Sequence, residues 1–315
     1  VRRHPHAFPG VTLDDLCRSR ATLEPWQRAD TVHEDSWHVK WRTTTDGMTG
    51  VAIEHPLRSL DDIDLYLETV PDPAREDGWR EIDWDRYLRR IDRGRESGLM
   101  LGAGASLRHG HTLLTLEYIC GFTELAVAMA EEDPRLDRLI DAVTVFNLAI
   151  VRRILSYRPD RVGYPEDLGS QQSTLISPQM FRRYIKPAYR RLMQPAVDQG
   201  AIVHMHSDGW LLAILDDLWE CGVNIVNAQD RVNGLHELRE FIDRRMAVDL
   251  DIDRQYVSVF GSRAQIHNWV RECVGVLGYP DGGLVLRFEA RPPATPDSLE
   301  AVAEAFEAVS GVRDR

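Results

Sequence analysis

Hydrophobic positions are spaced in two ways along most of the chain. From about residue 84, short apolar runs alternate with longer stretches whose apolar residues recur every three to four positions. The runs predict strands and the stretches predict helices. Ser177 before Pro178 and Thr295 before Pro296 predict helix starts, because proline at the first helical position loses no needed hydrogen bond. The expected strands are 99–105, 161–167, 201–206, 223–227, 245–250 and 283–288, and the expected helices are 84–96, 112–130, 134–157, 177–198, 209–221, 233–243, 263–277 and 296–310.

This alternation predicts the fold class. Short apolar strands separated by helices form parallel βαβ units. We expect an α/β fold, a (β/α)8 TIM-type barrel that forms a single domain over residues 1–315, with an open doubly wound sheet as the alternative. Neither GxGxxG after a first strand nor GxxxxGK followed by Ser or Thr is present, so a nucleotide-binding fold lacks its signature. Residues 1–83, with a polar helix candidate near 12–21, are expected to be an irregular segment that packs on or caps the barrel and hides its remaining strands.

The composition argues against several classes of partner. A net charge of −12 and a pI of about 5.4 argue against binding to a nucleic-acid backbone or to an anionic membrane surface. No apolar run approaches the roughly 20 residues that span a bilayer, and no apolar signal core follows the basic start of the chain. The four cysteines lie far apart and form no CxxC, so we expect reduced thiols in a cytoplasmic protein.

Polar residues stand at the predicted carboxyl ends of the strands, where barrel enzymes carry their active sites. We assign substrate contacts to polar residues at these strand ends and in the loops beside them. These substrate-binding candidates are His109, His111, Gln171, Gln229 and Asp230.

Two histidines in the segment IVHMHSDGW point to a metal. His204 and His206 are two positions apart in a predicted strand, so their imidazoles project from the same face. Such a pair is half of a metal site, and the third ligand must come from a neighbouring strand end. The alternative is one hydrogen-bonded core histidine and one that is partly exposed. A second pair, His109 and His111, lies in a predicted loop, which is a poorer metal scaffold, and fits substrate contact or a solvated loop better.

Paired acids are candidates for proton transfer. Asp249 and Asp251 share a predicted strand face, and burial of either carboxyl would raise its pKa. We assign catalytic proton transfer to Asp167, together with Glu166 or Asp249. The alternatives are a turn shaped by Glu166 and Asp167, and ion pairs between the aspartates and the many arginines of the chain.

Several segments resemble one known superfamily. PEDLGSQQSTLISPQMFRRYIKPAYRRL, from Pro165, resembles the part of uroporphyrinogen decarboxylase-like proteins that follows the fourth barrel strand, with its acidic Asp-Leu-Gly turn and Ser-Pro helix start. VHMHSDGWLLAILDDLWECGVNIVNAQD resembles the next unit, and FGSRAQIHNWVRECVGVLG and RPPATPDSLEAVAEAF resemble the last two. The resemblance runs from about residue 35 and implies a barrel of the superfamily that includes uroporphyrinogen decarboxylases and cobalamin-linked methyltransferases.

The resemblance also implies a ligand set. The methyltransferase branch binds zinc through a His-x-Cys strand end and a later cysteine. On that pattern His204 falls on the histidine, His206 replaces the first cysteine and Glu289 falls on the second. Two histidines and one carboxylate bind a divalent metal, Zn²⁺ or a harder ion such as Fe²⁺ or Mn²⁺. The Arg-rich RQAGR-type segment of the decarboxylase branch is not found in this sequence, which disfavours porphyrinogen decarboxylation.

The implied function is methyl transfer. The resemblance implies demethylation of a small methylated compound, with the metal as Lewis acid and a corrinoid protein as methyl acceptor, in a protein that forms a homodimer. A metal-dependent decarboxylase or lyase that acts on a small carboxylic acid is the first alternative. A metal-dependent hydrolase and a barrel that binds a ligand without turnover are the others.

Overall fold

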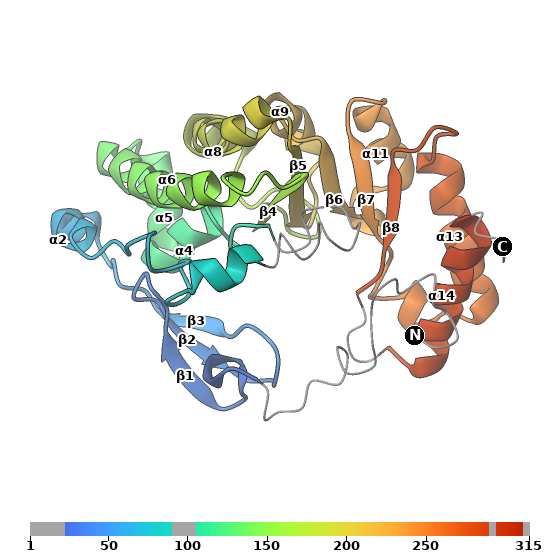
Figure 1. Cartoon of the computed structure of the whole chain (residues 1–315), viewed down its shortest axis with the longest axis horizontal. Coiled ribbons are helices and arrows are strands. Elements are labelled where there is room, and N and C mark those ends of the chain that lie inside the picture. The colour runs from blue at the N-terminus through green and yellow to red at the C-terminus, as the bar shows by residue number, and fades with distance from the viewer. Residues whose placement is uncertain (1–22, 90–104, 290–293, 311–315) are drawn as a thin grey trace.

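The computed structural model of the chain describes residues 23–89, 105–289 and 294–310. Its centre is a parallel sheet with the strand order β4-β5-β6-β7-β8 (Figure 1). These strands are β4 (Arg161–Asp167), β5 (Ile202–Asp208), β6 (Ile225–Gln229), β7 (Ala247–Asp251) and β8 (Leu284–Arg287). The five strands predicted after residue 160 are therefore confirmed, and each predicted end lies within two residues of the observed one.

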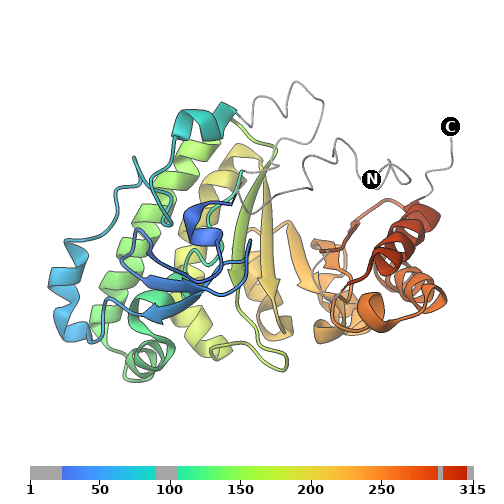
Figure 2. The ribbon, with the colours of Figure 1, turned by 90° about the horizontal axis from the view of Figure 1, so that it is seen from below.

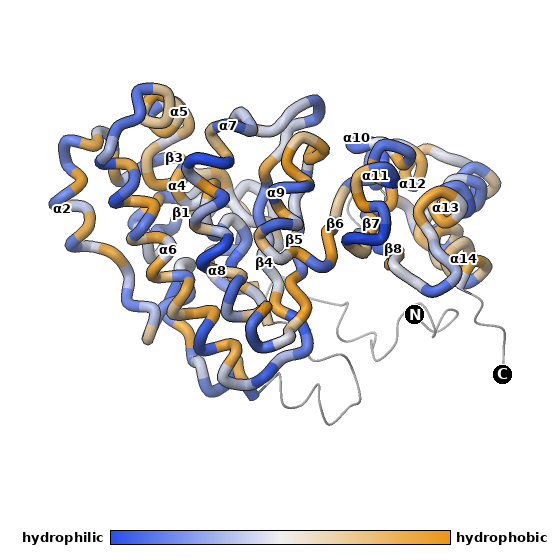
Figure 3. The backbone as a smooth tube through the Cα atoms, turned by 90° about the horizontal axis from the view of Figure 1, so that it is seen from above, coloured by the Kyte–Doolittle hydropathy of each residue, from blue (hydrophilic) through white to orange (hydrophobic). Residues whose placement is uncertain are grey.

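Helices connect the strands of the parallel sheet and cover its outer face (Figure 1). Figure 3 shows hydrophobic and hydrophilic positions alternating along these helices, as expected for elements with one buried face. Their bounds are α2 (Ile63–Leu67), α4 (Leu113–Cys120), α5 (Phe122–Ala130), α6 (Pro134–Leu155), α7 (Pro178–Met180), a π-helical turn η4 (Phe181–Ile185), α8 (Lys186–Gln199), α9 (Leu215–Glu220), α10 (Asp230–Asn233), α11 (Leu235–Ile242), α12 (Val257–Phe260), α13 (Arg263–Leu277) and α14 (Pro296–Ser310), with 3₁₀ turns η2 (Pro25–Gln27), η3 (Leu60–Asp62) and η5 (Leu212–Ile214).

Side chains at the helix starts explain why the predicted boundaries hold. Ser177 accepts a hydrogen bond from the backbone N–H of Met180 at the start of α7, and Asp133 does the same for Arg135 at the start of α6. Ser262 and Gln265 form a capping box at the start of α13. Each contact satisfies a backbone N–H that the first helical turn leaves without a partner.

The predicted helix 112–130 is in fact two helices. α4 and α5 meet at an angle of 109°, because Gly121 between them has a φ of +83° that side chains rarely adopt. A Cβ at this position would lie 3.3 Å from the ring of His55. The apolar pattern continues across the glycine, so periodicity alone did not reveal the break.

The N-terminal part differs from the irregular segment that the sequence predicts. Among its described residues, β1 (Thr31–Glu34), β2 (Lys40–Thr43) and β3 (Val51–Glu54) form an antiparallel sheet. Figure 2 shows this sheet in front of the helices α4 and α6, apart from the parallel strands. Each of the three strands is only four residues long and, unlike the four-residue β8, does not stand between predicted helices, so the strand–helix alternation did not reveal it. The three strands are thus not the hidden barrel strands that we expected there.

A further segment runs beside β4 and continues the parallel sheet. Ser106 forms a parallel bridge with Gly163, and the N–H of Leu107 donates to the Gly163 carbonyl. This position matches the end of the predicted strand 99–105, most of which lies outside the described residues, as do the helix at 12–21 and the second half of the helix at 84–96. Within the described ranges the parallel strands form an open, curved sheet and do not close into a ring.

One large hydrophobic cluster joins the two sheets and the helices. Trp37, from the turn after β1, packs edge-on against Phe146 of α6 with ring centroids 5.0 Å apart. Cys120, Cys221 and Cys273 are buried free thiols. No single helix of the described ranges is long and apolar enough to cross a membrane, although the bent pair α4 and α5 passes that test on length and composition alone. The shared cluster fixes the N-terminal sheet against the helices around the parallel strands.

Candidate metal centre

A cavity of about 790 Å³ opens beside β4 and β5. Four histidine and aspartate side chains of these strands line it, three of them at the carboxyl ends, and so do the β2–β3 turn and an aromatic group of the N-terminal part. Its principal lining residues are Trp41, Met48, Thr49, Trp79, His109, Tyr118, Arg161, Asp167, His204, His206, Asp208, Asp251, Arg254, Arg287 and Glu289. The cavity therefore lies where a barrel enzyme carries its active site.

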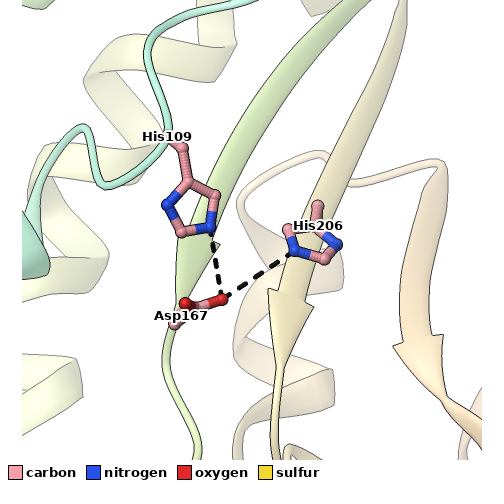
Figure 4. Close-up of side chains that lie close together, drawn as sticks. All are labelled: His109, Asp167 and His206. Carbon is pink, nitrogen blue, oxygen red and sulfur yellow. Dashed lines mark ion pairs between the residues drawn. The ribbon is translucent and has the colours of Figure 1, made fainter. Parts of the chain in front are cut away.

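His109, Asp167 and His206 come together at the edge of this cavity (Figure 4). The Nε2 atom of His109 lies 3.3 Å from Oδ1 of Asp167, and Nε2 of His206 lies 3.8 Å from the same oxygen. The ligand atoms of all three side chains lie within 4.8 Å of one another. Among the described residues, no other group of three or more His, Cys, Asp or Glu side chains meets this condition.

Strand pairing and a pinned loop bring these three side chains together. Asp167 ends β4 and lies opposite Asp208, while His206 lies opposite Pro165 in the parallel register of β4 and β5. The loop that carries His109 is held against β4, because the N–H of Gly110 donates to the Pro165 carbonyl at 2.9 Å. Backbone hydrogen bonds thus fix the relative positions of the three residues.

Asn227 on β6 orients the imidazole of His206. The amide nitrogen of Asn227 donates to the backbone carbonyl of Asp249 at 2.6 Å, which leaves its Oδ1 facing Nδ1 of His206 at 2.5 Å. This network assigns the proton to Nδ1 and directs Nε2 toward Asp167 and Asp208. An imidazole that is held in this way presents its free nitrogen to a metal.

The electrostatics of the pair His109 and Asp167 favour both charged forms. Burial acts to lower the pKa of His109, but the hydrogen bond and charge of Asp167 outweigh it and raise that pKa. Burial acts to raise the pKa of Asp167, but His109 and the backbone N–H of Asp208 outweigh it and lower that pKa. The ionised carboxylate of Asp167 is the form that ligates a cation, whereas His109 would have to release its proton when a metal binds.

The donor set fits a divalent metal. Metal–nitrogen and metal–oxygen bonds of 2.0–2.2 Å in a tetrahedral site place neighbouring ligand atoms about 3.4 Å apart, and the observed separations from the Asp167 oxygen are 3.3 and 3.8 Å. Two imidazoles and one carboxylate leave one position open, as in catalytic sites. The set suits Zn²⁺ as well as the harder ions Fe²⁺ and Mn²⁺.

The predicted ligands His204 and Glu289 do not join this group. Nε2 of His204 bonds Oδ2 of Asp249 at 2.9 Å. The carboxylate of Glu289 accepts from Arg254 at 2.7 Å. Both residues line the cavity. His206 instead groups with His109 and Asp167. The sequence had assigned His109 to substrate binding and Asp167 to proton transfer.

Glu166 and His111 lie behind the site, outside the cavity wall. The Glu166 carboxylate accepts from the backbone N–H groups of Thr112 and Leu114 and from the hydroxyl of Tyr189, at 2.9–3.1 Å. It thereby caps the N-terminus of α4. Burial raises the pKa of Glu166 to about 7 and lowers the pKa of His111 to about 3. Burial and helix capping, rather than catalysis, account for the contacts of both side chains.

Arg254 holds three carboxylates that face the cavity. Its guanidinium donates to Asp208 at 2.6 and 2.8 Å, to Glu289 at 2.7 Å and to Asp251 at 3.2 Å. Sequence reasoning missed Asp208, Arg254 and Asn227. Asp208 lies two positions after His206 and shares its strand face, which was a usable signal, whereas nothing local marks Arg254.

The remaining predicted substrate residues line a smaller pocket of about 220 Å³ beyond Arg254. Gln171 and Gln229 lie on its wall, and so does Asp230. Asp230 is buried, accepts from the indole N–H of Trp269 at 2.6 Å and from the backbone N–H of Asp253 at 2.9 Å, and burial raises its pKa to about 6. The pocket and the cavity share Asp251 and Arg254 as a common wall.

Arg108 ties the loop of His109 to the N-terminal sheet. Its guanidinium is 2% exposed and lies 3.5 Å from the buried carboxylate of Asp35, in the turn between β1 and β2. It also donates to the carbonyl of Gly78 and lies 4.5 Å over the ring of Trp79. The N-terminal sheet therefore supports the segment that carries the candidate ligand His109.

Comparisons with known proteins bear on the fold and on the family of the chain. A methyltransferase from Methanosarcina mazei has a TM-score of 0.62 at 15% identity, covering 87% of this chain and 76% of that chain, and supports the barrel-type fold. A B12-independent methionine synthase from Shewanella sp. W3-18-1, solved with selenomethionine, has a TM-score of 0.47 at 9% identity, over 70% of this chain and 64% of its own. A search of curated proteins finds no match. The model of the uroporphyrinogen decarboxylase (URO-D) family matches residues 108–307, from the loop that carries His109 to the last helix, and the chain belongs to this family.

Proposed function

We propose that this protein is a metal-dependent enzyme that transfers a methyl group from a small molecule, with one divalent metal held by His109, Asp167 and His206. The grouping of these three side chains at the edge of a large cavity carries the proposal. The fold shared with a methyltransferase supports the reaction class. Zinc is the metal that we expect, and a corrinoid protein is the methyl acceptor.

The residues around the site would divide the work. When bound, the metal supplies Lewis acidity at the heteroatom that loses its methyl group. Asn227 keeps Nε2 of His206 directed at the metal position, and the Arg108 contact keeps the His109 loop in place. Asp208 lies 3.9 Å from His206, and its carboxylate, oriented by Arg254, would hold a proton at the substrate heteroatom.

Metal titration tests the ligand set. Protein stripped with a chelator would be titrated calorimetrically with Zn²⁺, and with Fe²⁺ and Mn²⁺ under anaerobic conditions. We expect one ion per chain in the wild type and at least 100-fold weaker binding in Asp167→Asn and His206→Ala, with unchanged circular dichroism. Glu289→Gln and His204→Gln are the matched controls. Lost binding in these two variants, with binding kept in Asp167→Asn, would restore the ligand set that the sequence implied.

Turnover tests the reaction class. Methylated ethers, thioethers and amines would be incubated with the metal-loaded enzyme and cob(I)alamin, whose conversion to methylcobalamin is followed by absorbance. Methylation of the acceptor that requires Asp167 supports the proposal. Metal binding without methylation of cobalamin by any donor in the panel would contradict the methyl-transfer part.

A decarboxylase or lyase acting on a small carboxylic acid is the second candidate. Arg161 and Arg287 lie on the same cavity wall as the histidines and provide cations for a substrate carboxylate. The family description supports this chemistry as well. Release of CO₂ from a carboxylic acid, without any requirement for a methyl acceptor, would favour this reaction over methyl transfer.

A further inference from the structure

Asp251 has a buried carboxylate oxygen without a partner at the junction of the cavity and the smaller pocket. The residue ends β7 and contributes to both walls. Its side chain is 5% exposed, and its Oδ2 accepts from Arg254 at 3.2 Å. Its Oδ1 is buried and has no hydrogen-bond partner among the described residues. An unsatisfied buried acceptor costs free energy that a bound donor would recover.

The charges around this oxygen favour a cation over a neutral donor. Arg254 is surrounded by the carboxylates of Asp208, Asp251 and Glu289. Three ionised carboxylates and one guanidinium leave this cluster with a formal charge of −2. Two further arginines line the cavity: Arg287, which lies 3.8 Å from Asp249, and Arg161. Around Arg254 itself the carboxylates remain in excess, and this part of the cavity wall is negatively charged.

Aromatic rings of the N-terminal part and of α4 on the cavity wall complement this charge. Trp41 lies with its ring centroid 4.9 Å from that of Trp79 and 4.7 Å from that of Tyr118, and all three residues line the cavity. The faces of such rings attract cations. An organic cation that reached the Asp251 oxygen would therefore meet π-systems as well as carboxylates around the same cavity.

We propose that this junction binds an ammonium group of the substrate, with Oδ1 of Asp251 accepting one of its N–H bonds. The inference rests on the proposed function, because it names the substrate class of the same cavity: a small methylated molecule that carries a protonated amine. The ammonium lies at the shared wall, and the methylated heteroatom lies toward His109, Asp167 and His206. The smaller pocket takes the substituents on the nitrogen.

Matched probes test the charge that the junction selects. Isothermal titration calorimetry would compare 4-methoxybenzylamine, 4-methoxybenzyl alcohol and 4-methoxybenzoate, which share a ring and differ in one group. We expect the amine to bind wild-type protein at least tenfold more tightly than the alcohol and the benzoate. Tightest binding of the benzoate, equal binding of the three, or no saturable binding of the amine would each overturn the assignment.

Substitutions of two carboxylates that both contact Arg254 test whether Asp251 is the group that binds the ammonium. Asp251→Asn is expected to weaken binding of the amine at least tenfold and binding of the alcohol much less. Glu289→Gln removes one charge from the same cluster but leaves the Asp251 acceptor in place, so it is expected to weaken amine binding less than Asp251→Asn does. An unchanged amine affinity in folded Asp251→Asn overturns the role of Asp251, and the comparison of the three probes in the wild type stands even if that variant does not fold.

The metal keeps this test separate from the proposed function. The probe titrations would be run on metal-free protein and repeated with Zn²⁺, and Asp251→Asn would itself be titrated with Zn²⁺. Amine selectivity in a protein that binds no metal would contradict the proposed function and leave the ammonium site intact. Normal Zn²⁺ binding without amine selectivity would do the reverse.

Discussion

The two sides of β4 carry the same residue types with opposite roles. On the cavity side, His109 and Asp167 lie together with His206. Behind the strand, His111 and Glu166 lie 3.9 Å apart and are fully buried. His109 and Asp167 each have a counterpart behind the strand that is two positions or one position away in sequence, His111 and Glu166 respectively. The same two residue types therefore form the candidate metal site where their side chains face the cavity, and support α4 where they face the core.

The surroundings explain this division. Glu166 spends its oxygens on backbone N–H groups at the start of α4 and on Tyr189, whereas Asp167 faces two imidazoles and accepts only one backbone N–H. A carboxylate saturated by fixed donors stabilises structure, and one that faces other ligand atoms is free to bind a cation. The comparison predicts that changes behind β4 reduce stability and that changes in front reduce metal binding.

Glu166→Ala should have the largest effect. The substitution leaves several buried backbone N–H groups of α4 and the Tyr189 hydroxyl without an acceptor, and we expect a loss of about 3–5 kcal/mol in the free energy of unfolding. Urea denaturation followed by circular dichroism measures it. Asp167→Asn is the comparison variant in front of the strand, with an expected loss below about 1 kcal/mol. Equal losses in the two variants would contradict the division.

The two histidines of the loop should differ in the same way, His109 affecting metal binding and His111 affecting stability. His109→Ala is expected to weaken Zn²⁺ binding at least 100-fold, because it removes one of three ligands, with little effect on unfolding. His111→Ala is expected to leave Zn²⁺ affinity within about threefold and to lower stability by about 2 kcal/mol, because it opens a cavity in the core. Zn²⁺ titration and urea denaturation of both variants make the check, and loss of Zn²⁺ binding in folded His111→Ala would refute this assignment.

Asp230 offers a pH-dependent test of a buried carboxyl that lies away from the three ligands. Burial raises its pKa to about 6 from an ordinary 3.8, so the folded protein binds this proton more tightly than the unfolded chain does. Its contribution to stability is therefore greatest below about pH 4 and is lost as the pH rises to about 6. Relative to wild type, Asp230→Asn should gain about 2 kcal/mol between pH 4 and 6.5. Urea denaturation across this range measures the difference, which would stay constant if the carboxyl did not titrate.

Asn227→Ala should have the smallest effect on metal binding. Without the amide oxygen, the His206 ring loses the partner that directs its Nε2, and Zn²⁺ affinity should fall about tenfold. Calorimetric titration with Zn²⁺ checks this. Gln229→Ala, which removes an amide that contacts Asp208 instead of a histidine, is the control. If both variants lose affinity equally, the orienting role of Asn227 is wrong.

The sequence predicted the strand ends and their polar residues, but not which of these residues meet. His204 and His206 share a strand face, yet residues two apart are separated by almost 7 Å along a strand. Only His206 reaches the edge where the loop of His109 arrives, and His204 instead meets Asp249 on another strand. No local pattern shows that Arg254 holds Glu289, because that ion pair joins residues 35 positions apart.

The fold was predictable where local sequence signals mark the helices and strands, and it was not predictable elsewhere. Helices with capping residues and short apolar strands set between helices were found, because their signals are local. The N-terminal sheet was missed, since its short strands β1 to β3 follow one another without the intervening helices that mark β8, which is equally short. The turn at Gly121 was missed because only the φ of that residue, and not the apolar pattern, changes there.

The buried Arg108 makes the N-terminal sheet and the candidate metal-binding loop depend on each other, so substitutions in one constrain the other. A homologue that lost the turn around Asp35 would leave an uncompensated guanidinium in the core beside a ligand, which a protein tolerates poorly. Arg108 and Asp35 should therefore co-vary among related sequences. A chimaera that grafts only residues 105–289 onto a foreign N-terminal segment would need an acidic partner designed for this position.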